Sequence, residues 1–211
     1  MSQITAGKIQ NLLEQAARLN DSAAAEDSSV AGGKRVLPTA AEAEEVFSRL
    51  HEKLFQIEYW NSCSEILNFE LFSANGIASP KKAAALGDFI KITLPGSGKG
   101  DWVKIAEIHE SADETILTVQ PSYDPTDEEN VKTTSHFFTA ASTNNFCLQR
   151  DKTTINFYVI GLNEETNTEE TSGVLETARN YATANLGCLL GIQKVQWETF
   201  CRNFLEVKSE K

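Results

Sequence analysis

The groups with the clearest potential for chemistry are one glycine-rich stretch, three histidines and several carboxylates. Residues 95–100 read Pro-Gly-Ser-Gly-Lys-Gly, so the Gly98-Lys99 pair raises the question of a phosphate-binding loop. Such a loop needs a glycine five residues before Gly98 and a hydroxyl residue after the lysine, where this chain has Thr93 and Gly100. Strand-like segments flank the stretch on both sides, and a hairpin connection is therefore the favoured interpretation.

The histidines, His51, His109 and His136, lie too far apart in the sequence to form a local metal-binding motif. His136 begins a strand-like segment, where it is either a hydrogen-bonded sheet residue or a group that faces a cavity. A dyad of His136 and Cys147 across one hairpin is conceivable, although the apolar neighbours of Cys147 favour packing for this thiol. We expect no metal, no cofactor and no catalytic residue, and the pattern favours a non-enzymatic protein.

Acidic side chains gather in two expected loops and after the last strand-like segment. Those around residues 110–114 and 124–129 either solvate their loops or attract a basic partner surface. Asn163, Glu164 and Glu165 are expected at a rim of the sheet, where paired carboxylates can perform acid–base chemistry. No nucleophile or electrophile lies near them in the sequence, so a polar turn before a charged helix start is the favoured interpretation.

Composition narrows the class of protein. The formal net charge of −11, from 19 basic and 30 acidic residues, disfavours binding to nucleic acid or to an anionic membrane. The segment from Met1 to Leu19 lacks the long apolar run of a signal peptide or a membrane span. The four cysteines include no C-x-x-C pair, which is typical of reduced, buried thiols. We therefore expect a cytoplasmic protein.

Short β-type segments follow one another between Gly87 and Leu162, with turn signals between them. An earlier segment, residues 66–72, alternates in the same way. The pattern predicts the α+β class, with a strongly bent antiparallel sheet or partly closed barrel of about six to seven strands. An N-terminal helix and a C-terminal helical segment would pack on it. The six segments of the main run are 87–94, 102–108, 115–119, 135–140, 146–150 and 154–160.

The N-terminal region is predicted to be an appendage. Residues 3–19 have helical apolar spacing, and the Ser-, Ala- and Gly-rich stretch that follows is too poor in large apolar groups to order itself. The predicted organisation is a tethered amphipathic helix at 1–20, a flexible linker at 21–38 and a single α+β domain at 39–211.

Three further helices are expected. Thr39 has capping-box spacing before a helix whose apolar stripe extends to Ile57, and Thr168 can cap another. Gly187 and Gly191 are expected to break or bend the C-terminal helical segment. The final helix has one apolar stripe, formed by Trp197, Phe200, Cys201, Phe204 and Leu205.

The leading functional hypothesis is a non-enzymatic interaction or assembly module, because the N-terminal helix cannot bury its apolar stripe within itself. The helix would dock on its own domain, on a second copy or on another protein, and we expect self-association. The residues that would contact the partner are Ile9, Leu12, Leu13 and Leu19.

The segment order also resembles the helix-grip plan of START-like lipid- and polyketide-binding domains, with one strand, a helical segment, six strands and a final helix. The similarity lies in segment order and in no motif; here the helical insert is short and the C-terminal part is long. It implies a carrier or sensor of an apolar small molecule, with a cavity between the sheet and the C-terminal helix. A hydrolase or cyclase that uses His136 with a rim carboxylate is a third alternative. The expected lining residues are Trp102, His136, Phe137, Phe157 and Tyr158.

Overall fold

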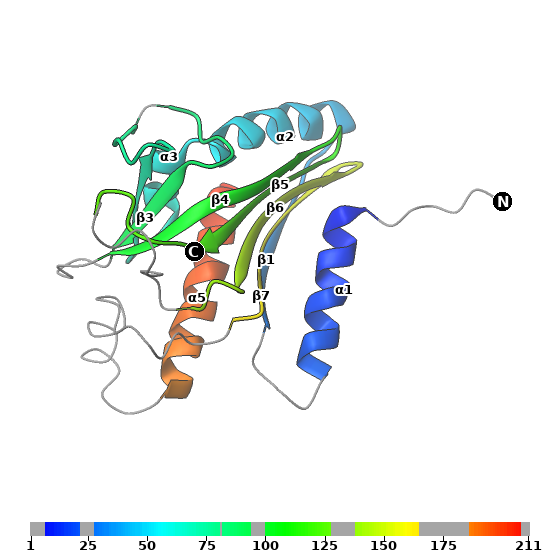
Figure 1. Ribbon diagram of the computed structural model, residues 1–211. Helices are drawn as coiled ribbons and strands as arrows, with labels where there is room; N and C mark the ends of the chain where they lie inside the picture. The colour runs from blue at the N-terminus through cyan, green and yellow to red at the C-terminus, as the bar shows by residue number, and fades with distance from the viewer. Residues whose placement is uncertain are drawn as a thin grey trace.

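One curved sheet organises the molecule. The computed structural model describes residues 7–21, 28–80, 82–93, 100–127, 138–164 and 186–207. Its seven antiparallel strands are in the order β1-β7-β6-β5-β4-β3-β2 (Figure 1), which confirms the predicted α+β class with a strongly bent antiparallel sheet. The strands are β1 (Ser28–Val36), β2 (Asn68–Phe72), β3 (Phe89–Thr93), β4 (Asp101–Glu110), β5 (Glu114–Pro121), β6 (Thr143–Asp151) and β7 (Thr154–Leu162).

Helices cover both faces of this sheet, because successive residues of a strand point to opposite faces and both sets are largely apolar. The helices α2 (Ala40–Leu54), α3 (Ile57–Cys63) and α5 (Leu186–Phe204) pack on the concave face. The helix α1 (Lys8–Asp21) packs on the convex face (Figure 1). A register shift between Ile105 and Glu107 on β4 adds local twist and bending to the sheet.

The flexible linker expected at 21–38 is largely replaced by a strand. Residues 28–36 form β1, which pairs with β7 from Ser28 opposite Leu162 to Val36 opposite Thr154. The linker was predicted from the lack of large apolar side chains. The strand forms nevertheless, because its backbone pairs with the N–H and C=O groups at the edge of β7. Residues 22–27 lie outside the described part of the chain.

The helical predictions have different outcomes. The Thr39 side chain accepts a hydrogen bond from the Glu42 backbone N–H at 3.2 Å, so the predicted helix start is confirmed. The apolar stripe up to Ile57 belongs to two helices, because α2 ends at Leu54 and α3 begins at Ile57. Gly187 and Gly191 were expected to break or bend the helical segment, and α5 runs through both residues without a break. The helix expected after Thr168 lies outside the described residues.

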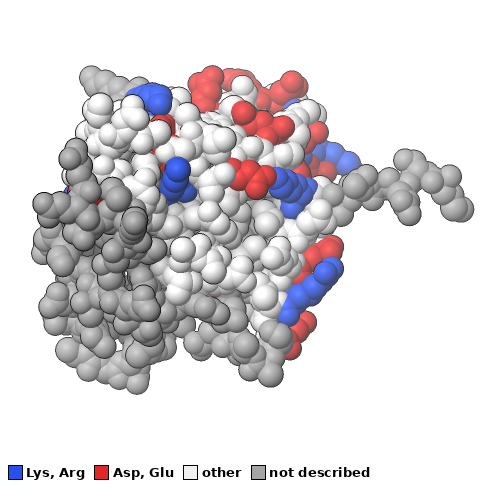
Figure 2. Space-filling view, viewed as in Figure 1, with Lys and Arg blue, Asp and Glu red and all other residues white. Residues whose placement is uncertain are grey.

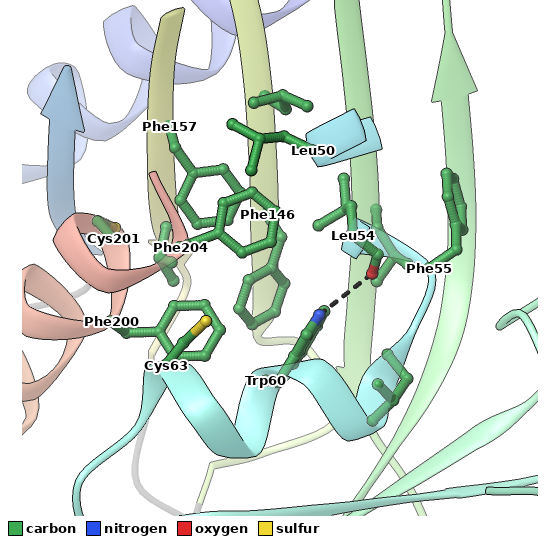
Figure 3. Close-up of a cluster of buried hydrophobic side chains, with 14 of the residues drawn as sticks. Leu50, Leu54, Phe55, Trp60, Cys63, Phe146, Phe157, Phe200, Cys201 and Phe204 are labelled. Carbon is green, nitrogen blue, oxygen red and sulfur yellow. Dashed lines mark hydrogen bonds between the residues drawn. The ribbon is translucent and has the colours of Figure 1, made fainter. Parts of the chain in front are cut away.

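The concave face is filled with aromatic rings (Figure 3). The Phe200 ring of α5 lies 5.8 Å from the Trp60 ring of α3 and 6.1 Å from the Phe146 ring of β6, measured between centroids. Phe204, one turn further along α5, stacks on Phe157 of β7 at 4.0 Å. The indole N–H of Trp60 donates to the Leu54 carbonyl oxygen, so its polar atom is satisfied inside this core.

Truncation of the central ring should strongly destabilise the fold. Phe200→Ala removes a fully buried ring that contacts both helices and strands, and we expect the free energy of unfolding to fall by about 3–5 kcal/mol in urea denaturation. Val195→Ala on the same helix is the control, because Val195 is 64% exposed and should change stability by less than about 0.5 kcal/mol. Similar losses for both variants would contradict this account of the core.

The helix α1 has its apolar side buried against its own chain. Ile9 and Ala16 are fully buried, and Leu12, Leu13 and Leu19 are half-buried. The Lys8 backbone N–H donates to Glu114, and the Ser28 hydroxyl donates to the Ala16 carbonyl oxygen. The charged outer side of α1 is visible at the edge of the molecule in Figure 2. The floor beneath the helix is formed by Ile116, Cys147, Tyr158, Ile160 and Leu162.

Loosening α1 should make Cys147 reactive. This thiol is fully buried under α1, and burial raises its pKa, so little thiolate is present in the folded protein. We expect Ile9→Asp to accelerate modification of Cys147 by a thiol reagent at least tenfold, measured by mass spectrometry of the Cys147 peptide. Arg18→Ala on the exposed side of the same helix is the control. Unchanged protection in Ile9→Asp would show that α1 does not shield this thiol.

Candidate ligand-binding site

The concave face changes from apolar to polar at one end. Ser29 of β1 lies opposite Gly161 of β7, which lies opposite Asn144 of β6, so these residues form one row across three strands. Adjacent positions in such a row are about 4.5–5.5 Å apart. The next row on the same face is apolar and contains Ala31, Val159 and Phe146.

Glu164 folds back over this row. Asn163, just after β7, has a positive φ of 53° that reverses the chain, and the Glu164 side chain then lies against Gly161. A β-carbon at Gly161 would collide with the Glu164 carboxyl, so the carboxyl occupies the space of a missing side chain. Glu164 is only 7% exposed. Its carboxyl therefore belongs to the interior and not to a solvated rim.

The Glu164 carboxyl is poorly compensated. Burial raises its pKa, and a hydrogen bond with Ser29 only partly opposes that effect. Its second oxygen, Oε1, is buried and has no hydrogen-bond partner. Within the described residues, no Lys, Arg or His forms an ion pair with it. An uncompensated carboxyl of this kind costs stability, so its presence calls for an explanation.

Two more buried polar atoms near this end lack partners. Asn144 Oδ1 accepts no hydrogen bond, and Trp197 Nε1 of α5 donates none. Trp197 belongs to this end because its ring lies 5.6 Å from the ring of Phe146, the concave-face residue next to Asn144 on β6. The described site thus offers two acceptors and one donor beside aromatic rings. That set can recognise a polar group on a small, otherwise apolar molecule.

The predicted lining residues do not share one space. Phe157 lies on the concave face against Phe204, whereas Tyr158, the next residue, lies on the convex face beside α1. Trp102 is also on the convex face, 4.8 Å from the Phe72 ring. His136 and Phe137 lie outside the described residues. The interpretation grouped residues by aromatic character, although strand alternation separates Phe157 from Tyr158.

The predicted partner-binding residues all lie on α1 and face the molecule's own sheet. Ile9 is fully buried there, and Leu12, Leu13 and Leu19 pack on the same cluster. Of the three docking modes considered, the helix adopts the one on its own domain. The apolar stripe that suggested an external partner is therefore already covered.

Other reactive groups do not assemble into a second site within the described residues. His51 contacts Glu110 at 2.7 Å in a pair between α2 and β4, far along the chain from Glu164. Burial raises the pKa of the Cys63 thiol to about 11 and that of Cys201 to about 12, so both are poor nucleophiles. Among the residues that the structure describes, no three His, Cys, Asp or Glu side chains form a group that could hold a metal ion. None of its helices is long and apolar enough to cross a membrane.

Comparison with solved structures finds one protein of similar fold at a TM-score of 0.50 and others at lower scores. A hypothetical protein from Helicobacter pylori is 8% identical, with 84% of this chain and 86% of that chain covered and a TM-score of 0.50. Protein MLL2253 from Mesorhizobium loti is 11% identical, with 84% and 95% covered and a TM-score of 0.41. The Aha1 dimer from Colwellia psychrerythraea is 10% identical, with 81% and 96% covered and a TM-score of 0.33. No family model and no curated protein matches the chain. At these identities the likeness concerns the fold alone.

Replacement of Glu164 should alter the dependence of stability on pH. Its folded pKa lies above the ordinary value of 4.5, so its contribution is present at low pH and is lost as pH rises through the folded pKa. Glu164→Gln cannot ionise and should therefore lose less stability than wild type as the pH rises above 4.5, measured by urea unfolding at several pH values.

Glu206→Gln provides a control of opposite sign. Burial alone would raise the pKa of Glu206, but hydrogen bonds from Lys53 and Arg49 lower it overall. Its contribution is therefore lost as pH falls below about 4.5, and the Gln variant should lose that acid-side dependence. Identical pH profiles for wild type and Glu164→Gln would contradict an uncompensated buried carboxyl.

Proposed function

We propose that the protein binds a small molecule, with the polar group of the ligand at Glu164 and Asn144 and the apolar body against Trp197 and Phe146. One observation carries the proposal: three buried polar atoms without partners border an otherwise apolar core. A ligand that supplies the missing hydrogen bonds would remove the cost of leaving them unpaired. The role is that of a carrier or sensor, because the described residues offer no nucleophile with an adjacent base.

The curved sheet and α5 support this placement. The helix α5 packs on β1 and β7, and Figure 1 shows its beginning beside the end of the sheet where β1 starts and β7 stops. Its other end is fastened, because Phe200 and Phe204 are fully buried in the aromatic core. A ligand would therefore lie between the sheet and the part of α5 that contains Trp197, beside the unpaired polar atoms.

Ligand binding should be visible at a single tryptophan. The protein has three tryptophans, and the indole N–H of Trp60 is bonded to Leu54 whereas that of Trp197 is unpaired. In ¹H–¹⁵N NMR spectra, titration with 2-phenylethanol should move the Trp197 indole signal and leave that of Trp60 in place. The hydroxyl of this probe can both donate to Glu164 or Asn144 and accept from Trp197.

Two variants make the titration decisive. Trp197→Phe assigns the signal, and Asn144→Leu should weaken binding by removing one of the two acceptors while keeping the fold's apolar character. No movement of the Trp197 signal at millimolar probe, or equal movement of all three indole signals, would overturn the proposal.

A further inference from the structure

The charge of the site points to the class of ligand, an inference that rests on the proposed function. Two other carboxylates near the core of this protein have cationic partners: Asp88 pairs with Lys82, and Glu206 pairs with Arg35, Arg49 and Lys53. Within the described residues Glu164 has none, although it is among the most buried carboxylates of the chain. A buried carboxyl is neutralised either by taking up a proton or by pairing with a cation, and a positive group would keep Glu164 ionised in this site.

The aromatic surroundings suit such a cation. Trp197 lies 5.4 Å from the Phe200 ring and 5.6 Å from the Phe146 ring, so three aromatic rings meet beside the polar row. Ring faces attract ammonium groups, most strongly for Trp and most strongly away from water. The described cation–π contacts of this protein use Tyr59, Trp102, Phe89 and Phe47, and therefore leave the Trp197 ring available.

The net charge of the whole protein also favours a positively charged ligand. The net charge of −11 creates a negative potential that concentrates small cations near the surface and repels small anions. The two unpaired oxygens, Glu164 Oε1 and Asn144 Oδ1, are both hydrogen-bond acceptors when Glu164 is ionised. An ammonium group, which has only donors, complements both.

We propose that the ligand is a small organic cation, an amine with an apolar or aromatic body, whose ammonium group donates hydrogen bonds to Glu164 Oε1 and Asn144 Oδ1. The ammonium also lies against the rings of Trp197 and Phe146. The indole N–H of Trp197 remains for an oxygen on the body of the natural ligand.

Proton release accompanies this binding. Among the described residues, Ser29 of β1 and Asn144 of β6 belong to the same row as Gly161, against which the Glu164 carboxyl lies, and neither of these two residues titrates. As the ammonium binds, a protonated Glu164 gives its proton to solvent and becomes the carboxylate partner. Affinity for the amine should thus rise with pH until Glu164 is ionised in the free protein, and then stay level while the amine keeps its proton.

The test compares 2-phenylethylamine with 2-phenylethanol, which differ only in the ammonium and hydroxyl groups. Calorimetric titration of the full chain at pH 7.5 should show at least tenfold tighter binding of the amine by wild type. In Glu164→Gln this preference should vanish while the alcohol still binds. Glu70→Gln, which removes an exposed carboxylate on β2, is the control with the same change in net charge and should keep the preference. Glu164→Asp should keep part of it.

Each other outcome is informative. Equal affinities of the two probes in wild type would overturn the cation inference and leave the proposed function standing. A preference that persists in Glu164→Gln would also overturn it, because the net charge and not this carboxyl would then be the cause. Failure of both probes to bind to folded wild-type protein would overturn the proposed function itself.

Discussion

The ring of Phe200 packs among several other aromatic rings and fixes how α5 lies on the sheet. This ring joins α5 to α3 through Trp60 and to the sheet through Phe146 and Phe157. Close-packed rings leave no freedom for α5 to slide along the sheet. The position of α5 then places Trp197, one turn before Phe200, beside the last apolar row and next to the polar row. The site is a consequence of how the core is packed.

The carboxylates at the two ends of the concave face have opposite electrostatic environments. Just after α5, Glu206 accepts hydrogen bonds from Arg49 and Lys53 at 2.6 Å, which connects the end of α5 to α2. Arg35 of β1 donates to the same carboxylate and to the Leu205 carbonyl oxygen. These contacts hold the end of α5 in place, and the pKa of Glu206 is lowered. At the other end Glu164 is more deeply buried, lacks a cation within the described residues, and has a raised pKa. One carboxylate stabilises the fold, whereas the other has capacity left for a ligand.

The sequence predicted most of the sheet because alternation and turn residues are local signals. The segments 102–108, 115–119, 146–150 and 154–160 fall within strands, and the segment 66–72 contains β2. It missed β1, whose stability comes from backbone pairing with β7 across more than a hundred residues. It noted Glu164 but expected a solvated rim, because burial of this side chain depends on Gly161 and on the turn at Asn163. The sequence could not show that Ser29, Asn144 and Trp197 lie near Glu164. Their positions depend on strand register and on how α5 packs on the sheet, which involve residues far apart in the chain. The one local signal for this site was Gly161 near the end of a predicted strand, followed three residues later by Glu164.

Gly161 is the residue that gives most support to the proposed binding site at this end of the core. The concave positions of β7 before it are Ile155, Phe157 and Val159, and a further β-branched residue would complete the apolar face. Glycine instead leaves room that Glu164 fills, which replaces favourable apolar burial with an uncompensated carboxyl. A sequence optimised for stability alone would do the reverse, and departures of this kind are expected where function requires them. Gly161→Val should therefore displace Glu164, raise the free energy of unfolding if the core relaxes around it, and abolish binding of either phenylethyl probe. Stability and ligand binding then compete for the same small volume at the end of the sheet.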